Sequence, residues 1–171
     1  MWLFGRPDPM NVVEDALRRR GWKYVRLDAD TILTGVQTAS RRLYFITIRH
    51  EEQKRTVLFL FNPLIGSAAD AFQTLAGGQP PFLRVHTNEG HSSQQVAEVC
   101  QSLMYMNYQI VLGCFERDER DGEIRFRIAI PYRDTNLTVE QVNWCIEIAI
   151  GTMDAFMPEI ENVVGSGRMT V

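Results

Sequence analysis

The sequence predicts one α+β domain in which helices pack on one face of a strongly twisted antiparallel sheet. Three observations predict it: amphipathic helical patterns with capping residues, β-rich segments with alternating apolar positions, and a length of 171 residues, typical of one domain. The expected order is helix, three antiparallel strands, an irregular insertion, helix, two strands and helix. The domain covers residues 11–164, between an N-terminal tail at 1–10 and a flexible tail at 165–171.

The first half contains one short helix followed by strands. Asn11 and Glu14 form the expected N-terminal cap of a helix at 11–20, and Gly21 ends it. Residues 22–38 then carry two β-rich stretches, and RLYFITIRH and RTVLFLF are consecutive strands joined by the polar turn EEQK. Because apolar residues fall on both faces of RTVLFLF, we expect it at the sheet centre, covered from two sides or by a second subunit.

Residues 62–91 are the irregular insertion. The segment begins and ends near proline breakers and has room for one or two helical turns, and FLRVHT can add one short strand. Phe72 and Leu75 either pack on the domain's own sheet or belong to a site specific to this protein.

The second half has clearer start and stop signals. Capping boxes at 92–95 and 138–141 begin the second and third helices, and an Asp-Gly dipeptide at 121–122 turns one strand back on the next. We expect Asn107 to cap the end of the second helix in a left-handed conformation. Pro158 is expected to end or kink the last helix.

These motifs resemble the YbjN family, whose members are described as bacterial regulators of sensory transduction with the type III secretion chaperone-like fold. The resemblance covers 11–164 and is strongest from residue 103, in LMYMNYQ, IVLGCFERDERDGEIRFRIAIPY and LTVEQVNWCIEIAIGTMDAFMPEI. The family's second helix commonly ends in Asn-x-x-Asn; here Asn107 matches the second position and Met104 replaces the first. The resemblance implies a non-enzymatic binding module, similar to secretion chaperones that act as homodimers and hold an extended stretch of a client protein.

Composition excludes several other classes. The net charge of −3 argues against a nucleic-acid partner, which usually requires a basic face. No apolar run reaches the roughly 20 residues that span a membrane, so we expect no stable membrane insertion, and the N-terminal MWLFGRPDPM does not fit a signal peptide. Cys100, Cys114 and Cys145 lack metal or redox spacing and are expected to be free thiols in the cytoplasm.

No enzymatic chemistry is expected. The sequence has no nucleophile elbow, phosphate-binding loop or HExxH motif, and the mixed-charge run at 116–123 does not follow the calcium-loop pattern. His86, His91 and Glu89 lie close in sequence, but a metal site needs three or four converging ligands. We therefore predict no catalytic residue, metal or cofactor.

The expected function is a chaperone-like or regulatory homodimer that holds a segment of a client protein. Flexible methionines beside aromatic rings can repack around varied ligands, and the candidate partner-binding residues are Phe72, Leu75, Phe82, Met104 and Met106. Two alternatives stay open: a small-ligand sensor or enzyme with a pocket beneath the 62–91 insertion, and a structural part of a larger assembly. A closed cavity with converging polar groups would favour the sensor, and an open apolar groove would favour client binding.

Overall fold

The computed structural model describes residues 7–64, 82–85, 90–133 and 135–166. Within these ranges, six strands form one sheet in the order β1-β2-β3-β4-β6-β5, and every neighbouring pair is antiparallel. The strands are β1 (Tyr24–Arg26), β2 (Thr31–Gln37), β3 (Leu43–Glu51), β4 (Thr56–Pro63), β5 (Cys114–Arg117) and β6 (Ile124–Pro131). The helices are α1 (Pro9–Arg19), α3 (Ser93–Gln109) and α4 (Val139–Ser166), with a 3-10 turn η1 (Glu52–Lys54) between β3 and β4.

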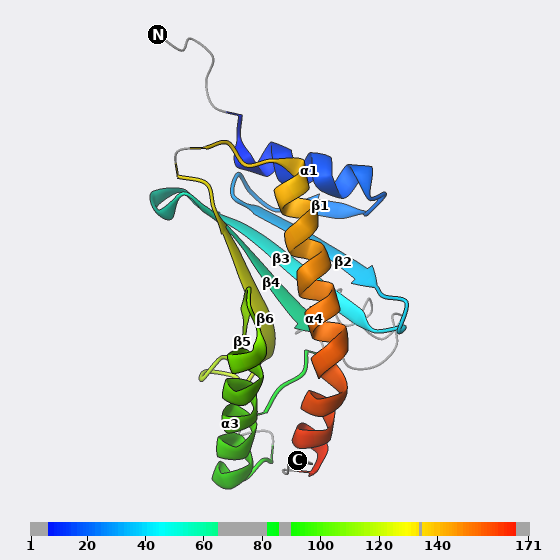
Figure 1. Ribbon diagram of the computed structural model, residues 1–171, viewed down its shortest axis with the longest axis vertical. Coiled ribbons are helices and arrows are strands. Elements are labelled where there is room, and N and C mark those ends of the chain that lie inside the picture. Colours follow the sequence, from blue (N-terminus) through cyan, green and yellow to red (C-terminus); the bar gives the residue numbers. More distant parts are fainter. Residues whose placement is uncertain (1–6, 65–81, 86–89, 134, 167–171) are drawn as a thin grey trace.

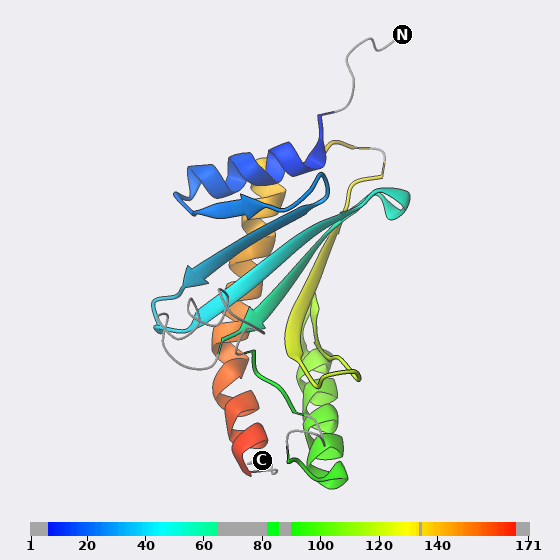
Figure 2. The same cartoon turned by 180° about the vertical axis from the view of Figure 1, so that it is seen from behind.

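The three α-helices gather on one side of the sheet. α4 runs along the sheet, and α1 crosses the first turns of α4. α3 packs against β5 and α4 (Figure 1). Seen from behind, the strands lie in front of α4 (Figure 2). The predicted α+β class is therefore confirmed. Although α4 has 28 residues, no helix in the described ranges is apolar over a length that could cross a membrane.

Four strands, and not the expected three, precede the insertion. The additional strand, β1, has only three residues and is paired to β2 through Val25 and Leu33. A tight connection makes this hairpin possible: the Leu27 N–H donates to the Thr31 carbonyl at 2.9 Å. The Arg26 side chain also holds the connection, because its NH2 donates to the Ala29 carbonyl at 2.8 Å.

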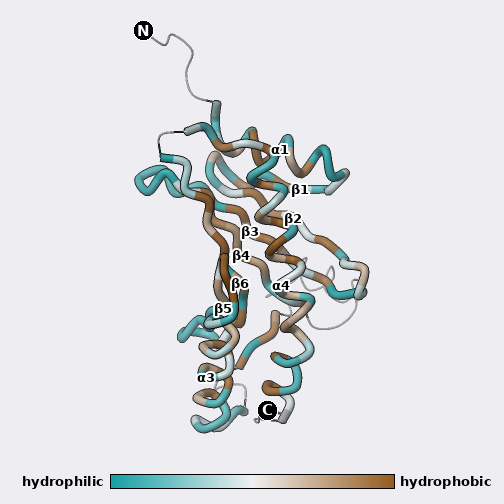
Figure 3. Tube along the Cα trace, viewed as in Figure 1, coloured by the Kyte–Doolittle hydropathy of each residue, from teal (hydrophilic) through white to brown (hydrophobic). Residues whose placement is uncertain are grey.

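The core lies between the sheet and the helices. Tyr44, Ile46 and Ile48 alternate along β3 toward the helices and are almost fully buried, as are Phe59 and Phe61 of β4. Hydrophobic residues follow the central strands, whereas the tip between β3 and β4 is hydrophilic (Figure 3). The predicted central place of β4 is confirmed, since it pairs with β3 on one side and β6 on the other.

The first helix begins earlier than predicted. Asp8, and not Asn11, is the N-cap: its carboxylate accepts a hydrogen bond from the Met10 N–H at 2.9 Å, and Pro9 occupies the first turn. Starting there adds Met10, which has no exposed surface, to the buried stripe. The expected stop at Gly21 is confirmed, because this glycine has a φ of +70°.

Both predicted capping boxes are present. In the first, the Gln95 N–H donates to the Ser92 hydroxyl at 3.1 Å and the Ser92 N–H donates to the Gln95 side chain at 2.8 Å. In the second box, at the start of α4, the Gln141 N–H donates to the Thr138 hydroxyl at 3.1 Å and the Thr138 N–H donates to the Gln141 side chain at 2.9 Å. These reciprocal bonds satisfy N–H groups that a helix start leaves without partners.

Asn107 has a structural role, but not the predicted one. It lies inside α3, and Ile110, in an extended conformation, is the C-cap. The Asn107 amide instead donates to the Phe115 carbonyl at 2.8 Å and accepts from the Phe115 N–H at 2.7 Å. The side chain therefore pairs with the backbone of β5 in place of a further strand, and it fastens the helix to the sheet.

Pro158 does not end the last helix, which continues to Ser166. A proline inside a helix removes one backbone hydrogen bond, at a cost of about 3 kcal/mol. The ring itself is exposed, whereas Met157 and Ile160 beside it are buried against the core. Tertiary packing on both sides of the proline therefore maintains the helix.

Gly113 connects α3 to β5 where no side chain fits. Its φ is +88°, and a Cβ there would lie 2.5 Å from Cζ of Phe126. We expect Gly113→Ala to lower the free energy of unfolding by more than about 2 kcal/mol, measured by urea denaturation. The control is Gly151→Ala in α4, which meets nothing within 4 Å and should raise stability by about 0.5–1 kcal/mol. A neutral Gly113→Ala would contradict this account.

Candidate functional site

The face of the sheet opposite the helices, here called the second face, carries an apolar groove. The groove, called the sheet groove, has a volume of about 740 Å³, and the described residues that line it come mainly from β1, β2 and β3. Val25, Leu33 and Phe45 share this face because Val25 pairs with Leu33 and Phe45 stands two pairs further along β2. Val25 is 61% exposed. Apolar surface is thus accessible here.

Gly35 makes room for the groove. It lies directly opposite Phe45 in the β2–β3 pairing, and its missing side chain leaves the floor low at that point. The backbone conformation at Gly35 is one that other residues adopt, and an added Cβ would meet only the Tyr44 carbonyl, at 3.5 Å. The backbone conformation therefore does not require glycine at this position. What the glycine provides is the space that a side chain would otherwise fill.

Phe82, one of the predicted partner-binding residues, borders this region. Its ring centroid lies 5.7 Å from that of Phe45, and its backbone forms an isolated bridge with Leu64, which lines the groove. The side chain is half-buried. Phe72 and Leu75, the other two candidates from the insertion, lie outside the described residues.

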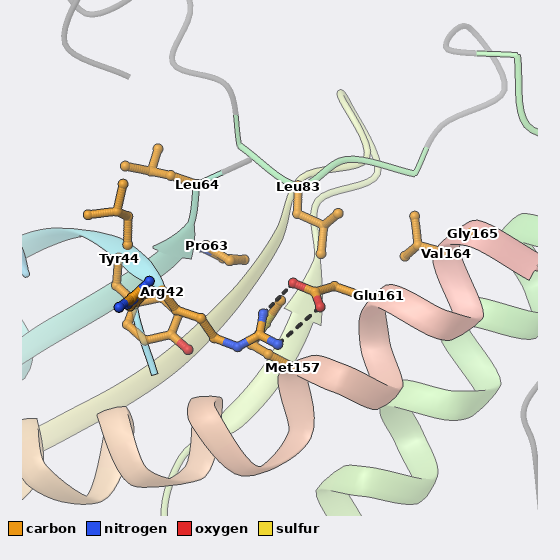
Figure 4. Close-up of a pocket in the computed structure, with 11 residues that line it drawn as sticks. Arg42, Tyr44, Pro63, Leu64, Leu83, Met157, Glu161, Val164 and Gly165 are labelled. Carbon is orange, nitrogen blue, oxygen red and sulfur yellow. Dashed lines mark hydrogen bonds and ion pairs between the residues drawn. The ribbon is translucent and has the colours of Figure 1, made fainter. Parts of the chain in front are cut away.

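A second cavity of about 430 Å³, here called the end pocket, lies between the start of β3, the end of β4 and the last turns of α4 (Figure 4). Its walls are mostly apolar, with Pro63, Leu64 and Met157 among them. Across it, the Arg42 guanidinium forms two parallel hydrogen bonds to the Glu161 carboxylate, one of them NH2 to Oε2 at 3.1 Å.

Tyr44 anchors α4 beside this pocket. Its hydroxyl donates to Oδ1 of Asp154 at 2.6 Å, and the same oxygen accepts from the Thr38 hydroxyl at 3.4 Å. Burial, reinforced by the neighbouring Asp154 carboxylate, raises the pKa of Tyr44 far above its ordinary value. The phenol is therefore a hydrogen-bond donor at neutral pH and does not act as an acid or base there.

Leu43, Tyr44 and Leu64 line both cavities. The sheet groove and the end pocket are therefore neighbours at the start of β3, the first on the second face and the other beside α4. The lining of the sheet groove includes one charged side chain among the described residues, Lys23, whereas Arg41, Arg42 and Glu161 lie at the end pocket.

The exposed side of α3 is a second apolar surface, here called the α3 face. It consists of Met104, Tyr105 and Tyr108 on the helix and Val111 just beyond the C-cap Ile110. Of these, Tyr108 is 91% exposed and Met104 73%. Of the two predicted methionines, Met104 belongs to this face, but Met106 has no exposed surface and is part of the core. Two positions along a helix turn the side chain by about 200°, so the pair cannot share a face.

The tyrosines and the valine of the α3 face were missed in the sequence. The i, i+4 spacing of Met104 and Tyr108 is the pattern that indicates one side of a helix, whereas Val111 lies beyond the helix end. A second stripe, at Val99, Leu103 and Met106, is buried. The sequence alone does not say which of two apolar stripes faces the core.

One polar cluster contains a histidine. The His50 ring lies 2.9 Å from Oδ1 of Asp30 through Nδ1 and is hydrogen-bonded to the Tyr132 hydroxyl through Nε2. Asp30 precedes β2 and Tyr132 follows β6, so the cluster ties three strand ends together. In the described part of the chain, no three His, Cys, Asp or Glu side chains are placed to hold a metal ion. His86 and Glu89 lie outside it.

All three cysteines are free. Cys145 is buried in α4, and burial raises the pKa of its thiol. The same cause, together with the Glu116 carboxylate, raises the pKa of Cys114. A raised pKa keeps a thiol protonated and a poor nucleophile, so the surroundings of Cys114 and Cys145 do not activate them.

Comparisons with known proteins identify no family: no family model and no curated protein matches this sequence. Among solved structures, the chain is similar to one from the HopA1-SchA chaperone-effector complex, with 13% sequence identity and a TM-score of 0.49. The similarity covers 87% of this chain and 92% of that chain. A likeness this remote says nothing of activity, and the resemblance to the YbjN family stays a prediction based on the sequence motifs.

The Tyr44–Asp154 contact generates a pH prediction. Because the pKa of Tyr44 is raised in the folded protein, its contribution to stability is complete below the ordinary tyrosine pKa near 10 and is lost as the pH rises above it. Tyr44→Phe should cost about 1–3 kcal/mol at neutral pH, by urea denaturation. The variant should also lose less stability than the wild type between about pH 9 and about pH 11. Parallel stability curves would contradict this role.

Proposed function

We propose that this domain is a non-enzymatic protein-binding module, chaperone-like or regulatory, that holds a segment of a client protein in the sheet groove. The observation that carries the proposal is the open apolar groove of about 740 Å³ on the second face of the sheet. Its described lining offers aromatic and aliphatic side chains with one charge, Lys23. Such a surface suits apolar side chains from an extended segment, each of which contributes about 1.5–3 kcal/mol when fully buried.

The domain acts as a homodimer in this proposal, and the α3 face is the surface for the second copy. The exposed side chains of Met104, Tyr105 and Tyr108 on the helix, with Val111 just beyond it, lie near the edge strand β5 and form a patch that a monomer rarely leaves exposed. A twofold axis through this face would bring Tyr108 of one copy against the same region of the other. The sheet groove lies on β1 to β3, at the other edge of the sheet, and remains accessible.

A small-ligand sensor is the second candidate, because Arg42, Glu161 and Tyr44 gather at the end pocket, which borders the insertion at Leu64 and Leu83. These polar groups already pair with one another: Arg42 binds Glu161, and Tyr44 binds Asp154. A ligand would have to break these pairs to use them. The apolar groove therefore favours the client-binding function, whether the client is transient or a permanent partner in an assembly.

Filling the groove tests client binding. Gly35→Val should project a side chain over the groove floor while preserving the strand, since valine favours β structure. We expect the partners captured by the wild type, identified by cross-linking and mass spectrometry in the native host, to be lost with this variant. Thr47→Val is the control: it adds a valine on the same face, outside the groove lining. Circular dichroism checks the fold, and partners retained by a folded Gly35→Val protein would refute the proposal.

The homodimer is tested by light scattering. The wild type should have twice the 19.6 kDa mass of the chain at micromolar concentration, and a variant with Tyr108→Asp and Val111→Asp should have the mass of one chain. Trp144→Gln, which changes an exposed apolar side chain on α4, should remain dimeric. A wild-type mass of one chain would exclude the dimer.

A further inference from the structure

The sheet groove and the neighbouring end pocket carry an excess of positive charge. The sheet groove is apolar apart from Lys23, and the end pocket has Arg41 and Arg42 against a single carboxylate, Glu161. Arg42 is engaged by Glu161 through two hydrogen bonds. Among the described residues that line the two cavities, Lys23 and Arg41 are therefore not balanced by a carboxylate, in a protein whose net charge is −3.

Arg41 is held at the pocket by the backbone. It lies in the turn between β2 and β3 with a φ of +64°, a left-handed conformation that is uncommon for residues other than glycine. Two hydrogen bonds close the turn, from the Arg41 N–H to the Thr38 carbonyl and from the Thr38 N–H to the Arg42 carbonyl, both at 2.9 Å. The side chain is exposed and borders the end pocket. The turn thus fixes the backbone from which the Arg41 side chain extends, beside the end pocket and next to Leu43 of the sheet groove.

We propose that the segment bound here is an extended apolar peptide with acidic residues, whose apolar side chains occupy the sheet groove and whose carboxylates meet Arg41 and Lys23. This inference rests on the proposed function and specifies the client's chemistry. Guanidinium and carboxylate groups form directional paired hydrogen bonds, so Arg41 at one end would give the bound segment a direction as well as added affinity. An apolar groove by itself selects neither direction nor charge.

The competing occupants differ in their chemistry. A basic segment would meet Lys23 and Arg41 as like charges, and a neutral apolar segment would leave both unused. Glu161 does not change this expectation, because its carboxylate already binds Arg42. The bound segment is therefore distinguished by its acidic residues.

The test is a selection of random peptides of about 12 residues, which span about 40 Å when extended, on the immobilised full chain. Enriched peptides should combine apolar residues with Asp or Glu. Fluorescence anisotropy with the most enriched peptide should show affinity that falls with rising ionic strength. Arg41→Gln should weaken binding about fivefold and reduce this salt dependence, the size expected for one exposed ion pair.

The control is Arg55→Gln. Arg55 is also an exposed arginine with positive φ, at +48°, in the turn at the opposite end of β3, outside both cavities. Its substitution should leave the affinity and its salt dependence unchanged. Equal effects of Arg41→Gln and Arg55→Gln would show that net charge, not the site, is responsible, and would overturn the inference.

The remaining outcomes separate this inference from the proposed function. Loss of peptide binding in Gly35→Val shows that the groove binds peptides. If the enriched peptides are then neutral or basic, or if Arg41→Gln has no effect, the proposed preference for acidic residues is wrong. If no peptide is enriched, or binding survives in a folded Gly35→Val protein, the sheet groove is not a peptide site and both proposals fail.

Discussion

The alternation of side chains along β2, β3 and β4 is the constraint on which the rest of the structure depends. Successive residues of a strand point to opposite faces, so Tyr44 and Ile46 enter the core while Phe45, between them, cannot. Strands that carry apolar side chains on both faces need to be covered on both sides. The described helices supply it on one face, and among the described residues the second face carries the apolar groove.

The long helix α4 is the second determinant, because it places the end pocket. Two contacts join it to β3: Tyr44 to Asp154, and Arg42 to Glu161 two turns further along the helix. Both involve residues that flank the start of the strand where the sheet groove begins. Pairing the polar groups with one another leaves the cavities around them mostly apolar. The same contacts that hold the helix thus leave the surface around them mostly apolar.

Local signals were reliable at two of the three predicted helix starts. The capping boxes at 92–95 and 138–141 form as expected, since both partners are three residues apart in the chain. By the same local rules Asn11 was expected to cap the first helix, where Asp8 does so. Asn107 does not cap α3, and Pro158 does not end α4. Asn107 finds its partner in Phe115, and Pro158 is kept in a helix by packing that only the folded chain supplies.

The candidate surfaces follow the same division. The apolar character of both sides of β4 and of the run around Met104 could be recognised in the sequence, and so could the class of fold. The sequence did not show which stripe of α3 is buried. Both stripes are apolar, and only the packing of the helix on the sheet buries Met106 and leaves Tyr108 exposed. Gly35 and Arg41 carried no signal in the sequence, because only the fold places Gly35 opposite Phe45 and Arg41 beside the end pocket.

The sequence by itself therefore determined the secondary structure, its approximate order and the excess of apolar surface, since periodicity and capping act over a few residues. Only the tertiary structure decided where this excess apolar surface lies. The described strands and helices had to pack before a groove formed on the second face, with Lys23 in its lining and Arg41 at the neighbouring end pocket. Long-range packing sets these positions, and no local pattern encodes them.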